Sequence, residues 1–151
     1  MIRPINLNDD HENEQLIAVQ QAAYRVEAAL IQFDDIPPLF DTVETLRASH
    51  ETFYGYFMEG ELAGMIAYQY DGETLDIYRL AVNPAHFKQG IASALLRCIE
   101  TVEPDVHRVI VSTGSLNTPA RQLYARHDYL LLGEQLIADG VYISHYEKKL
   151  R

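Results

Sequence analysis

Apolar and polar residues recur along this chain with two different periods, and each change of period marks the start of a new element. Ile2 to Leu7 is predicted to form a short strand. After Asp9 and Asp10, either of which can cap a helix, apolar residues recur about every 3.6 positions. The apolar face expected for this first helix is formed by Leu16, Val19, Ala23, Val26 and Leu30.

An acidic, proline-bearing segment follows the first helix. Gln32 to Phe40 is predicted to be a loop, because Pro37 and Pro38 forbid a helix there. Asp41 to Ser49 has the pattern of a second, shorter helix. Two helices joined by an acidic loop are a candidate wall of a substrate site, and a loop that is merely solvated is the alternative.

Strand-like segments separated by turn residues come next. Glu59-Gly60-Glu61 and Asp71-Gly72 are turn signals, and the second is typical of a hairpin. The expected strands are Phe53 to Met58, Leu62 to Tyr70 and Thr74 to Val82. Short turns between them make these three strands antiparallel neighbours.

The period changes again between Leu80 and Glu100, the stretch on which the functional interpretation depends. Pro84 ends the third strand, because proline cannot donate a hydrogen bond to a sheet. From Gln89 to about Val102 the pattern is helical, and it leads to a strand at Arg108 to Thr113. A strand, helix and strand of this length place the two strands parallel, with a right-handed crossover.

The last part of the chain predicts one more helix and a closing hairpin. Thr118 and Pro119 begin the helix, which runs to about Arg126. The hairpin strands are Tyr129 to Ile137 and Val141 to Lys148. We therefore expect a single mixed α/β domain of the α+β type over residues 1–151.

Composition supports a globular domain and narrows its partners. Of the 151 residues, 48% are apolar and 23% are charged, and no apolar run approaches the roughly 20 residues of a membrane span. A net charge of −10 without any Lys/Arg cluster repels nucleic acid. It attracts a cationic substrate, although solubility alone is the other interpretation. The N-terminal residues lack a signal-peptide core and Cys98 is the only cysteine, so we expect a cytoplasmic protein without disulfides or membrane contact.

The loop before the third helix is a candidate phosphate site. A helix start carries unpaired N–H groups and the positive end of the helix dipole, and both suit a phosphate. Gly90 and Ala92 leave room for a ligand to approach the backbone closely. A connection without any ligand is the alternative, and the loop alone does not decide between them.

A family resemblance changes that balance. Val82-Asn83-Pro84, followed by Gly90 and Ala92, resembles motif A of the Gcn5-related N-acetyltransferases (GNAT), an acetyl-coenzyme A-dependent family. The family pattern is V-x-P followed by [QR]-x-x-G-x-[GA]. Phe87 stands where the family usually has Gln or Arg, and the neighbouring Lys88 offers the missing positive charge.

A second motif lies in the late helix. Asn117, Ala120, Leu123 and Tyr124 fit the N-x-x-A-x-x-L-Y pattern found downstream of motif A in the same family. Asp128 replaces the glycine that usually follows. Two motifs in the right order, on the right elements, are much more specific than either alone.

The resemblance covers roughly residues 50 to 148 and implies the GNAT-like fold of acyl-coenzyme A N-acyltransferases. That fold has a central mixed sheet of about seven strands, with an antiparallel N-terminal meander and about four helices. One parallel strand pair splays apart, and the pantetheine arm of the cofactor enters the gap.

The resemblance also implies the activity, which is transfer of an acetyl group from acetyl-coenzyme A to a primary amine by direct attack. Tyr124 would protonate the leaving sulfur as the general acid. Amides near Leu80 to Val82 would polarise the thioester carbonyl, and those of Lys88 to Ser93 would hold the pyrophosphate. The expected cofactor-binding residues are Leu80, Ala81, Val82, Phe87, Lys88, Gln89, Gly90, Ile91, Ala92, Ser93, Asn117 and Tyr124.

The general base and the acceptor site are expected at other acidic positions. Some family members use a glutamate six residues before the motif A valine, and Asp76 occupies that place. A surface role for Asp76, with a water chain in place of a base, is the alternative. Tyr78 and Val82 share the face of Asp76 by the two-residue period of a strand. We expect Tyr78, with Asp34, Asp35 and Asp41 around the acidic loop, to bind a small-molecule or peptide amine that is cationic.

Other chemistries find no support in the sequence. The six histidines lack metal-ligand spacing, and no G-x-S-x-G, P-loop or C-x-x-C motif occurs, so no metal is expected. Two classes of function are left, an N-acetyltransferase and a non-catalytic acyl-coenzyme A-binding regulatory domain on the same fold. Retention of Tyr124 favours the enzyme. Assembly as a homodimer stays open.

Overall fold

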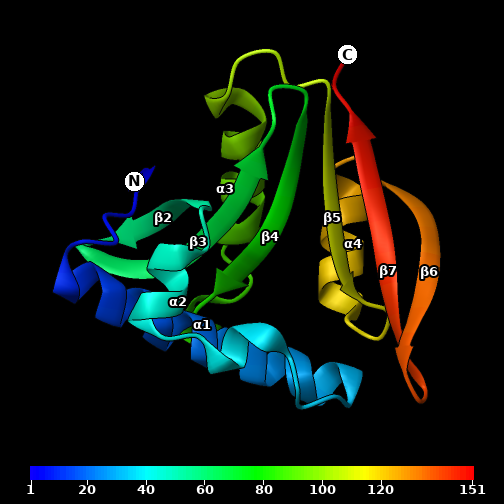
Figure 1. Ribbon diagram of the computed structural model, residues 1–151, viewed down its shortest axis with the longest axis horizontal. Helices are drawn as coiled ribbons and strands as arrows, with labels where there is room; N and C mark the ends of the chain where they lie inside the picture. Colours follow the sequence, from blue (N-terminus) through cyan, green and yellow to red (C-terminus); the bar gives the residue numbers. More distant parts are fainter.

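A computed structural model describes all 151 residues as one seven-stranded sheet with helices on both faces (Figure 1). The strands are β1 (Ile2–Pro4), β2 (Thr52–Met58), β3 (Glu61–Tyr70), β4 (Thr74–Val82), β5 (Arg108–Gly114), β6 (Leu130–Ala138) and β7 (Val141–Lys149). Their order in the sheet is β1-β2-β3-β4-β5-β7-β6. Only β4 and β5 pair in parallel, which confirms the expected meander, crossover and closing hairpin.

Four α-helices and two short 3-10 turns complete the fold. They are α1 (Asp10–Ile31), η1 (Pro37–Phe40), α2 (Val43–Ala48), η2 (Pro84–His86), α3 (Ile91–Val102) and α4 (Thr118–Arg126). The first strand and the proline-bearing loop differ from the prediction. β1 ends at Pro4 rather than Leu7, and Pro37 begins a 3-10 turn, which a proline at the first position permits. None of the helices is both long and apolar enough to cross a membrane.

Two hydrophobic cores lie on opposite faces of the sheet. Leu95, Leu96 and Ile99 of α3 pack on one face, and Leu16 and Val19 of α1 pack on the other. β3 contributes to both cores, because its apolar run from residue 62 to 68 alternates between the two faces. A central strand covered on both sides is expected to be apolar without interruption.

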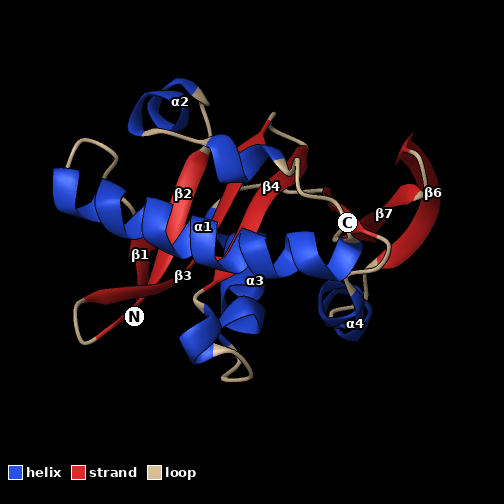
Figure 2. Cartoon of the chain, turned by 90° about the horizontal axis from the view of Figure 1, so that it is seen from below, coloured by secondary structure: helices blue, strands red, loops and turns tan.

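The parallel pair is short, and this leaves the sheet open at one end. β4 and β5 are paired only from Thr74 with Arg108 to Ile77 with Val111. Beyond these residues the two strands diverge, and α1 runs across the end where they do so (Figures 1 and 2). The splayed strand pair is therefore confirmed.

A β-bulge at Tyr78 reorients the outer half of β4. Arg79 pairs with Ala67 and Ile77 with Tyr68, so Tyr78 has no partner on β3. The extra residue inverts the alternation of side chains beyond it. The prediction that Asp76 and Val82 share a face was therefore wrong, because a simple period of two does not include a bulge.

The buried face of α1 differs from the predicted one. Asp9 caps the helix by accepting hydrogen bonds from the N–H groups of His11 and Glu12. Val26 and Leu30 of the predicted apolar face are exposed. The buried residues are Asn13, Leu16, Val19, Gln20, Tyr24, Ala28 and Ile31. The helix thus turns several polar side chains toward the sheet.

Candidate active site

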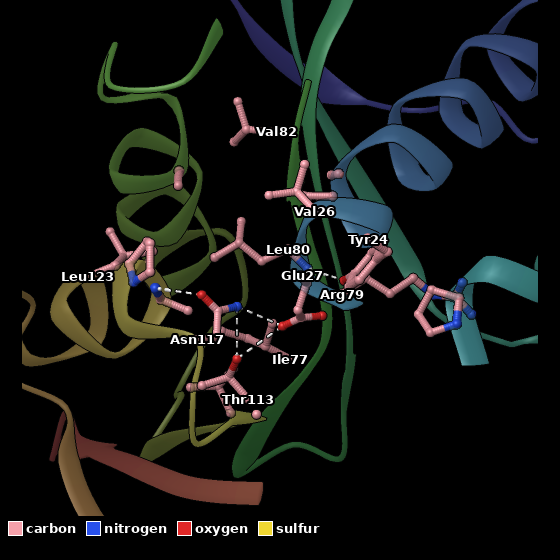
Figure 3. A pocket seen from close by; sticks show the side chains of 18 of the residues that line it. Tyr24, Val26, Glu27, Ile77, Arg79, Leu80, Val82, Thr113, Asn117 and Leu123 are labelled. Atoms are coloured by element: carbon pink, nitrogen blue, oxygen red, sulfur yellow. Dashed lines mark hydrogen bonds between the residues drawn. The ribbon is translucent and has the colours of Figure 1, made fainter. Parts of the chain in front are cut away.

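A cavity of about 930 Å³ lies where β4 and β5 diverge. Its walls come mainly from α1, β4, β5, α4 and the start of α3, with further residues from η1, η2, β6 and β7. Figure 3 shows side chains of β4, β5 and α1 converging on this space. The cavity therefore joins parts of the chain that are far apart in sequence.

One end of the cavity is formed by the start of α3. Gly90 is the N-cap residue in the left-handed conformation, with φ 77°, and it offers no side chain to cap the helix. The first bond of the helix runs from the Ala94 N–H to the Gly90 carbonyl at 3.0 Å, so the amides of residues 91 to 93 precede it. Lys88 and Arg126 also line the cavity here. This end combines uncapped amides with positive charge.

The backbone of β4 presents a single unoccupied amide to the gap. The Leu80 N–H donates to the Tyr24 hydroxyl at 3.2 Å, whereas the Asn83 N–H donates to the Ala63 carbonyl of β3 at 2.8 Å. N–H groups two residues apart point to the same side of a strand, so the Val82 N–H faces the gap. Of the amides expected to polarise a carbonyl, that of Leu80 is already occupied.

Tyr124 also lines the cavity. Its ring packs between those of Tyr129 and Tyr146, with centroid separations of 5.8 and 5.5 Å. Burial, with smaller contributions from the charges of Tyr24 and Glu27, raises the pKa of Tyr124 well above that of a free phenol. Its hydroxyl makes no hydrogen bond within the protein and keeps its proton at neutral pH.

Glu27 reaches across the open end of the sheet from α1. One carboxylate oxygen, Oε1, accepts hydrogen bonds from Asn117 Nδ2 at 2.8 Å and from Thr113 Oγ1 at 3.1 Å. Figure 3 shows these three side chains meeting between α1, β5 and the start of α4. The Asn117 Oδ1 atom accepts from the Ala120 N–H and so caps α4. The side chain of Asn117 is therefore hydrogen-bonded both to Glu27 and to the start of α4.

A cluster of one arginine and two carboxylates forms the other end of the cavity. Arg79 donates two hydrogen bonds to Glu51, at 2.9 and 3.1 Å, and further ones to Asp41 and Gln20. Burial lowers the pKa of Arg79, but the bonds and charges of Glu51 and Asp41 outweigh it and raise the pKa overall. The cluster holds the segment before α2 and the start of β2 against β4.

The structure brings most of the predicted site residues together. The predicted residues that line the cavity are Tyr78, Leu80, Ala81, Val82, Phe87, Lys88, Gly90, Ile91, Ala92, Ser93, Asn117 and Tyr124. Gln89 is adjacent to them but does not line it, and neither Asp34 nor Asp35 does. This geometry does not favour a direct contact of Asp34 and Asp35 with the acceptor, which stays a prediction. The loop lines the cavity instead with Phe33, Ile36, Pro37 and Pro38.

Asp76 lies outside the cavity. It lines a smaller hollow of about 420 Å³ with Arg108, Ser112 and His145, where Ser112 Oγ and His145 Nδ1 are 2.6 Å apart. Only Val111 and Ser112 line both spaces. Burial raises the pKa of Asp76. This position does not favour a place for Asp76 beside the reacting atoms, and its role as base stays a prediction.

Several polar residues of the cavity were not predicted. Tyr24 and Glu27 come from α1, Glu51 from the segment before β2, and Arg79 from β4. The α1 residues could have been found, because Gln20, Tyr24 and Glu27 recur at the helical period. Polar residues at such positions point to a site rather than to a core. The structure contains no group of three or more His, Cys, Asp or Glu side chains that could hold a metal ion.

Comparison with known proteins settles the family. The family model described as "Acetyltransferase (GNAT) family" matches residues 13–129. The chain belongs to the GNAT family. The match extends the resemblance seen in the two motifs to α1, which carries Tyr24 and Glu27.

A curated relative of this GNAT chain is the UPF0157 protein YqkA of Bacillus subtilis (strain 168). It is 38% identical over 130 residues, which are 86% of this chain and 38% of the relative. The chain thus spans little more than a third of that protein.

Solved structures share the fold along almost the whole chain. The ribosomal-protein-S18-alanine N-acetyltransferase of Escherichia coli has a TM-score of 0.77 and 16% identity, covering 99% of this chain and 93% of its own. The paia N-acetyltransferase of Thermoplasma acidophilum, in complex with coenzyme A, has a TM-score of 0.73 and 18% identity, covering 99% and 98%. At such identities the likeness shows the GNAT fold alone.

Proposed function

We propose that this protein is an acetyl-coenzyme A-dependent N-acetyltransferase that moves an acetyl group to a cationic primary amine by direct attack on the thioester. One observation carries the proposal. A single cavity at the diverging strands is lined by an uncapped, positively charged helix start, by a wall of carboxylates and by Tyr124, which stays a neutral phenol. An anionic acyl donor and a cationic acceptor each find an end that suits their charge.

The donor end fits the diphosphate of coenzyme A. The amides of residues 91 to 93 lack partners within the protein, and a helix start stabilises negative charge. A Cβ built on Gly90 meets no atom within 4 Å, so the space above this residue is open to a ligand. Lys88 and Arg126 lie at the same end, which supports the suggestion that Lys88 replaces the basic residue missing at Phe87. The relative from Thermoplasma acidophilum in complex with coenzyme A supports the same donor.

Two groups of the chain then serve the reaction in the gap. Acetyl-coenzyme A supplies the acetyl thioester. The Val82 N–H faces the gap and donates to the carbonyl oxygen as negative charge develops there. Tyr124, held as a neutral phenol by its burial, gives its proton to the departing sulfur.

The acceptor end favours a positively charged amine. Three carboxylates line it, those of Glu27, Asp41 and Glu51, against the single cation of Arg79. The acceptor end therefore carries a negative net charge, as does the whole chain with −10. A cationic amine is therefore attracted both by the surface and by the cavity.

The donor end is tested with Gly90→Val, which places a branched side chain where the diphosphate would approach. Coenzyme A should raise the melting temperature of the natural protein through binding, and this shift should disappear in the variant. Gly60→Val is the matched control. Gly60 has φ 82° and an equally open surrounding, but it lies in the β2–β3 turn away from the cavity.

Both valine variants carry the same backbone strain, so a lost shift in Gly90→Val alone identifies the binding site. Equal shifts in both variants would remove the phosphate site. Turnover is then measured with acetyl-coenzyme A and primary amines. Tight coenzyme A binding without turnover of any amine would favour the alternative, a non-catalytic acyl-coenzyme A-binding domain.

A further inference from the structure

Glu27 differs from the other carboxylates of the cavity because no cation compensates its charge. Asp41 and Glu51 both bind Arg79, whereas the only partners of Glu27 are the neutral donors Asn117 and Thr113. A partly buried carboxylate without a cation is unfavourable unless the site serves to bind one.

The geometry leaves half of this carboxylate free for a ligand. Both hydrogen bonds reach Oε1, so Oε2 has no partner within the protein. The two bonds come from β5 and from the start of α4, so they hold the side chain of an α1 residue in the gap between the strands (Figure 3). Tyr24 and Tyr124 are close enough for the charge of Glu27 to contribute to their raised pKa values, after burial.

We infer that Glu27 binds the ammonium group of the acceptor through Oε2 and takes the proton that the amine must lose before it attacks. The inference rests on the proposed acetyl transfer and names its general base. Asn117 and Thr113 act as positioning residues that orient the carboxylate. The role expected of Asp76 passes to Glu27, because only Glu27 lines the cavity.

The protons and bonds of this reaction balance. Of the three protons on the ammonium nitrogen, one passes to Glu27 and then to solvent. The nitrogen forms a bond to the acetyl carbon, and the bond from that carbon to sulfur breaks. Tyr124 protonates the sulfur and is restored by a second proton from nitrogen, while the third stays in the amide product.

The surroundings of Glu27 define the body of the acceptor. Val26 and Leu30 from α1, with Phe33 and Ile36 from the loop, line the same cavity and are apolar. All four carboxylate oxygens of Asp41 and Glu51 already accept hydrogen bonds within the protein, so Oε2 of Glu27 is the only carboxylate oxygen of the cavity left without a partner for an ammonium group. We therefore assign an acceptor with one ammonium group on an apolar body.

The test compares 2-phenylethylamine with 2-phenylethanol, which has the same body without the charge. Binding of each is measured by calorimetry on protein saturated with coenzyme A. Glu27→Gln keeps an oxygen for the bonds from Asn117 and Thr113 but removes the charge, and Glu27→Asp keeps the charge on a shorter side chain. Glu14→Gln is the matched control, an exposed residue about 20 Å earlier on the same helix.

We expect the natural protein and Glu14→Gln to bind the amine at least tenfold more tightly than the alcohol. Glu27→Gln should bind both alike, and Glu27→Asp should lie between. A spermidine titration should show no advantage over the monoamine. The inference is overturned if Glu27→Gln binds the amine as the natural protein does, or if the natural protein does not prefer the amine to the alcohol.

Turnover separates this inference from the proposed function. Glu27→Gln should lower kcat about a hundredfold with acetyl-coenzyme A and the amine, while the thermal shift with coenzyme A is kept. A lost thermal shift in the natural protein would instead refute the donor site. Asp76→Asn is the rival variant, and a larger loss of kcat there than in Glu27→Gln would return the base to Asp76 and overturn the assignment to Glu27.

Discussion

At the scale of single residues, the position of Tyr124 separates a catalytic effect from a structural one. Its hydroxyl has no hydrogen-bond partner within the protein, so Tyr124→Phe removes no native bond. Turnover should fall by about 10²–10⁴, because the departing sulfur loses its proton donor. The free energy of unfolding should stay within about 0.5 kcal/mol of the natural value. Single-turnover kinetics and urea unfolding measure the two effects.

Tyr129→Phe, a change to the neighbouring ring, should have the opposite effect to Tyr124→Phe, because it should affect stability and not turnover. The Tyr129 hydroxyl donates to Glu100 at 2.8 Å and does not line the cavity. Its loss should cost about 1 kcal/mol of stability and leave turnover unchanged. If Tyr124→Phe destabilised the protein and kept its turnover, Tyr124 would be a packing residue only.

Site residues that belong to a local motif could be predicted from the sequence, whereas those that act through distant partners could not. Gly90, Asn117 and Tyr124 belong to compact motifs, so their places followed from the sequence. Glu27 and Arg79 act through partners that are distant in the chain, 90 residues apart for Glu27 and Asn117. No local pattern encodes such a meeting, and only the polar positions on the buried face of α1 indicated it.

At the scale of elements, α1 packs closely against β5 because Gly114 has no side chain. A Cβ built on Gly114 lies 2.4 Å from Cγ2 of Ile31, so the last turn of α1 packs directly on the end of this strand. Glu27 lies one turn earlier on the same helix and bonds to Thr113, the neighbour of Gly114. Close packing at Gly114 therefore sets the depth at which Glu27 enters the gap.

Gly114→Ala should disturb both stability and the acceptor end. Overpacking of this kind costs about 1–3 kcal/mol, and the displaced helix should raise the KM for the amine more than the KM for acetyl-coenzyme A. Urea unfolding and steady-state kinetics measure these changes. Adding Ile31→Ala should recover part of the loss, because it removes the colliding atoms.

Gly133→Ala is the matched control for this substitution. Gly133 lies in β6, and a Cβ built there meets nothing within 4 Å, so stability and both KM values should hardly change. If the effects of Gly114→Ala and Ile31→Ala were strictly additive, the proposed contact between α1 and β5 would not control the site.

The elements themselves followed from the sequence more readily than their relative orientation. Turn residues and hydrophobic periods located every strand of the meander, and Thr74–Val82 has the predicted bounds. The bulge at Tyr78 did not follow, because nothing in the run from Thr74 to Val82 marks an extra residue. That bulge turns Arg79 toward α1 and Glu51. The structure of the acceptor end therefore depends on an irregularity that was not predicted.

At the scale of the whole molecule, the cavity is charged in opposite senses at its two ends. Lys88 and Arg126 lie at the donor end, within a protein whose net charge is −10. An anionic donor is thus repelled by the surface and attracted locally, whereas a cationic acceptor is attracted by both. The two substrates should therefore respond differently to salt.

We expect the KM for 2-phenylethylamine to rise about two- to fivefold between 10 and 150 mM salt, because the screening length falls from about 30 Å to about 8 Å. The KM for acetyl-coenzyme A should change less, since its two contributions oppose each other. Asp34→Asn with Asp35→Asn removes two exposed charges that do not line the cavity, and it should flatten this slope without altering the KM at high salt.

Glu27→Gln should behave in the opposite way. It removes a contact at short range, which salt screens little, so the KM for the amine should be raised at every salt concentration while most of the slope persists. Steady-state kinetics of the three proteins over one salt series compare these effects directly. A flat slope in the natural protein would show that the surface charge does not recruit the acceptor. Equal salt responses in both variants would show that contact and surface charge do not act separately.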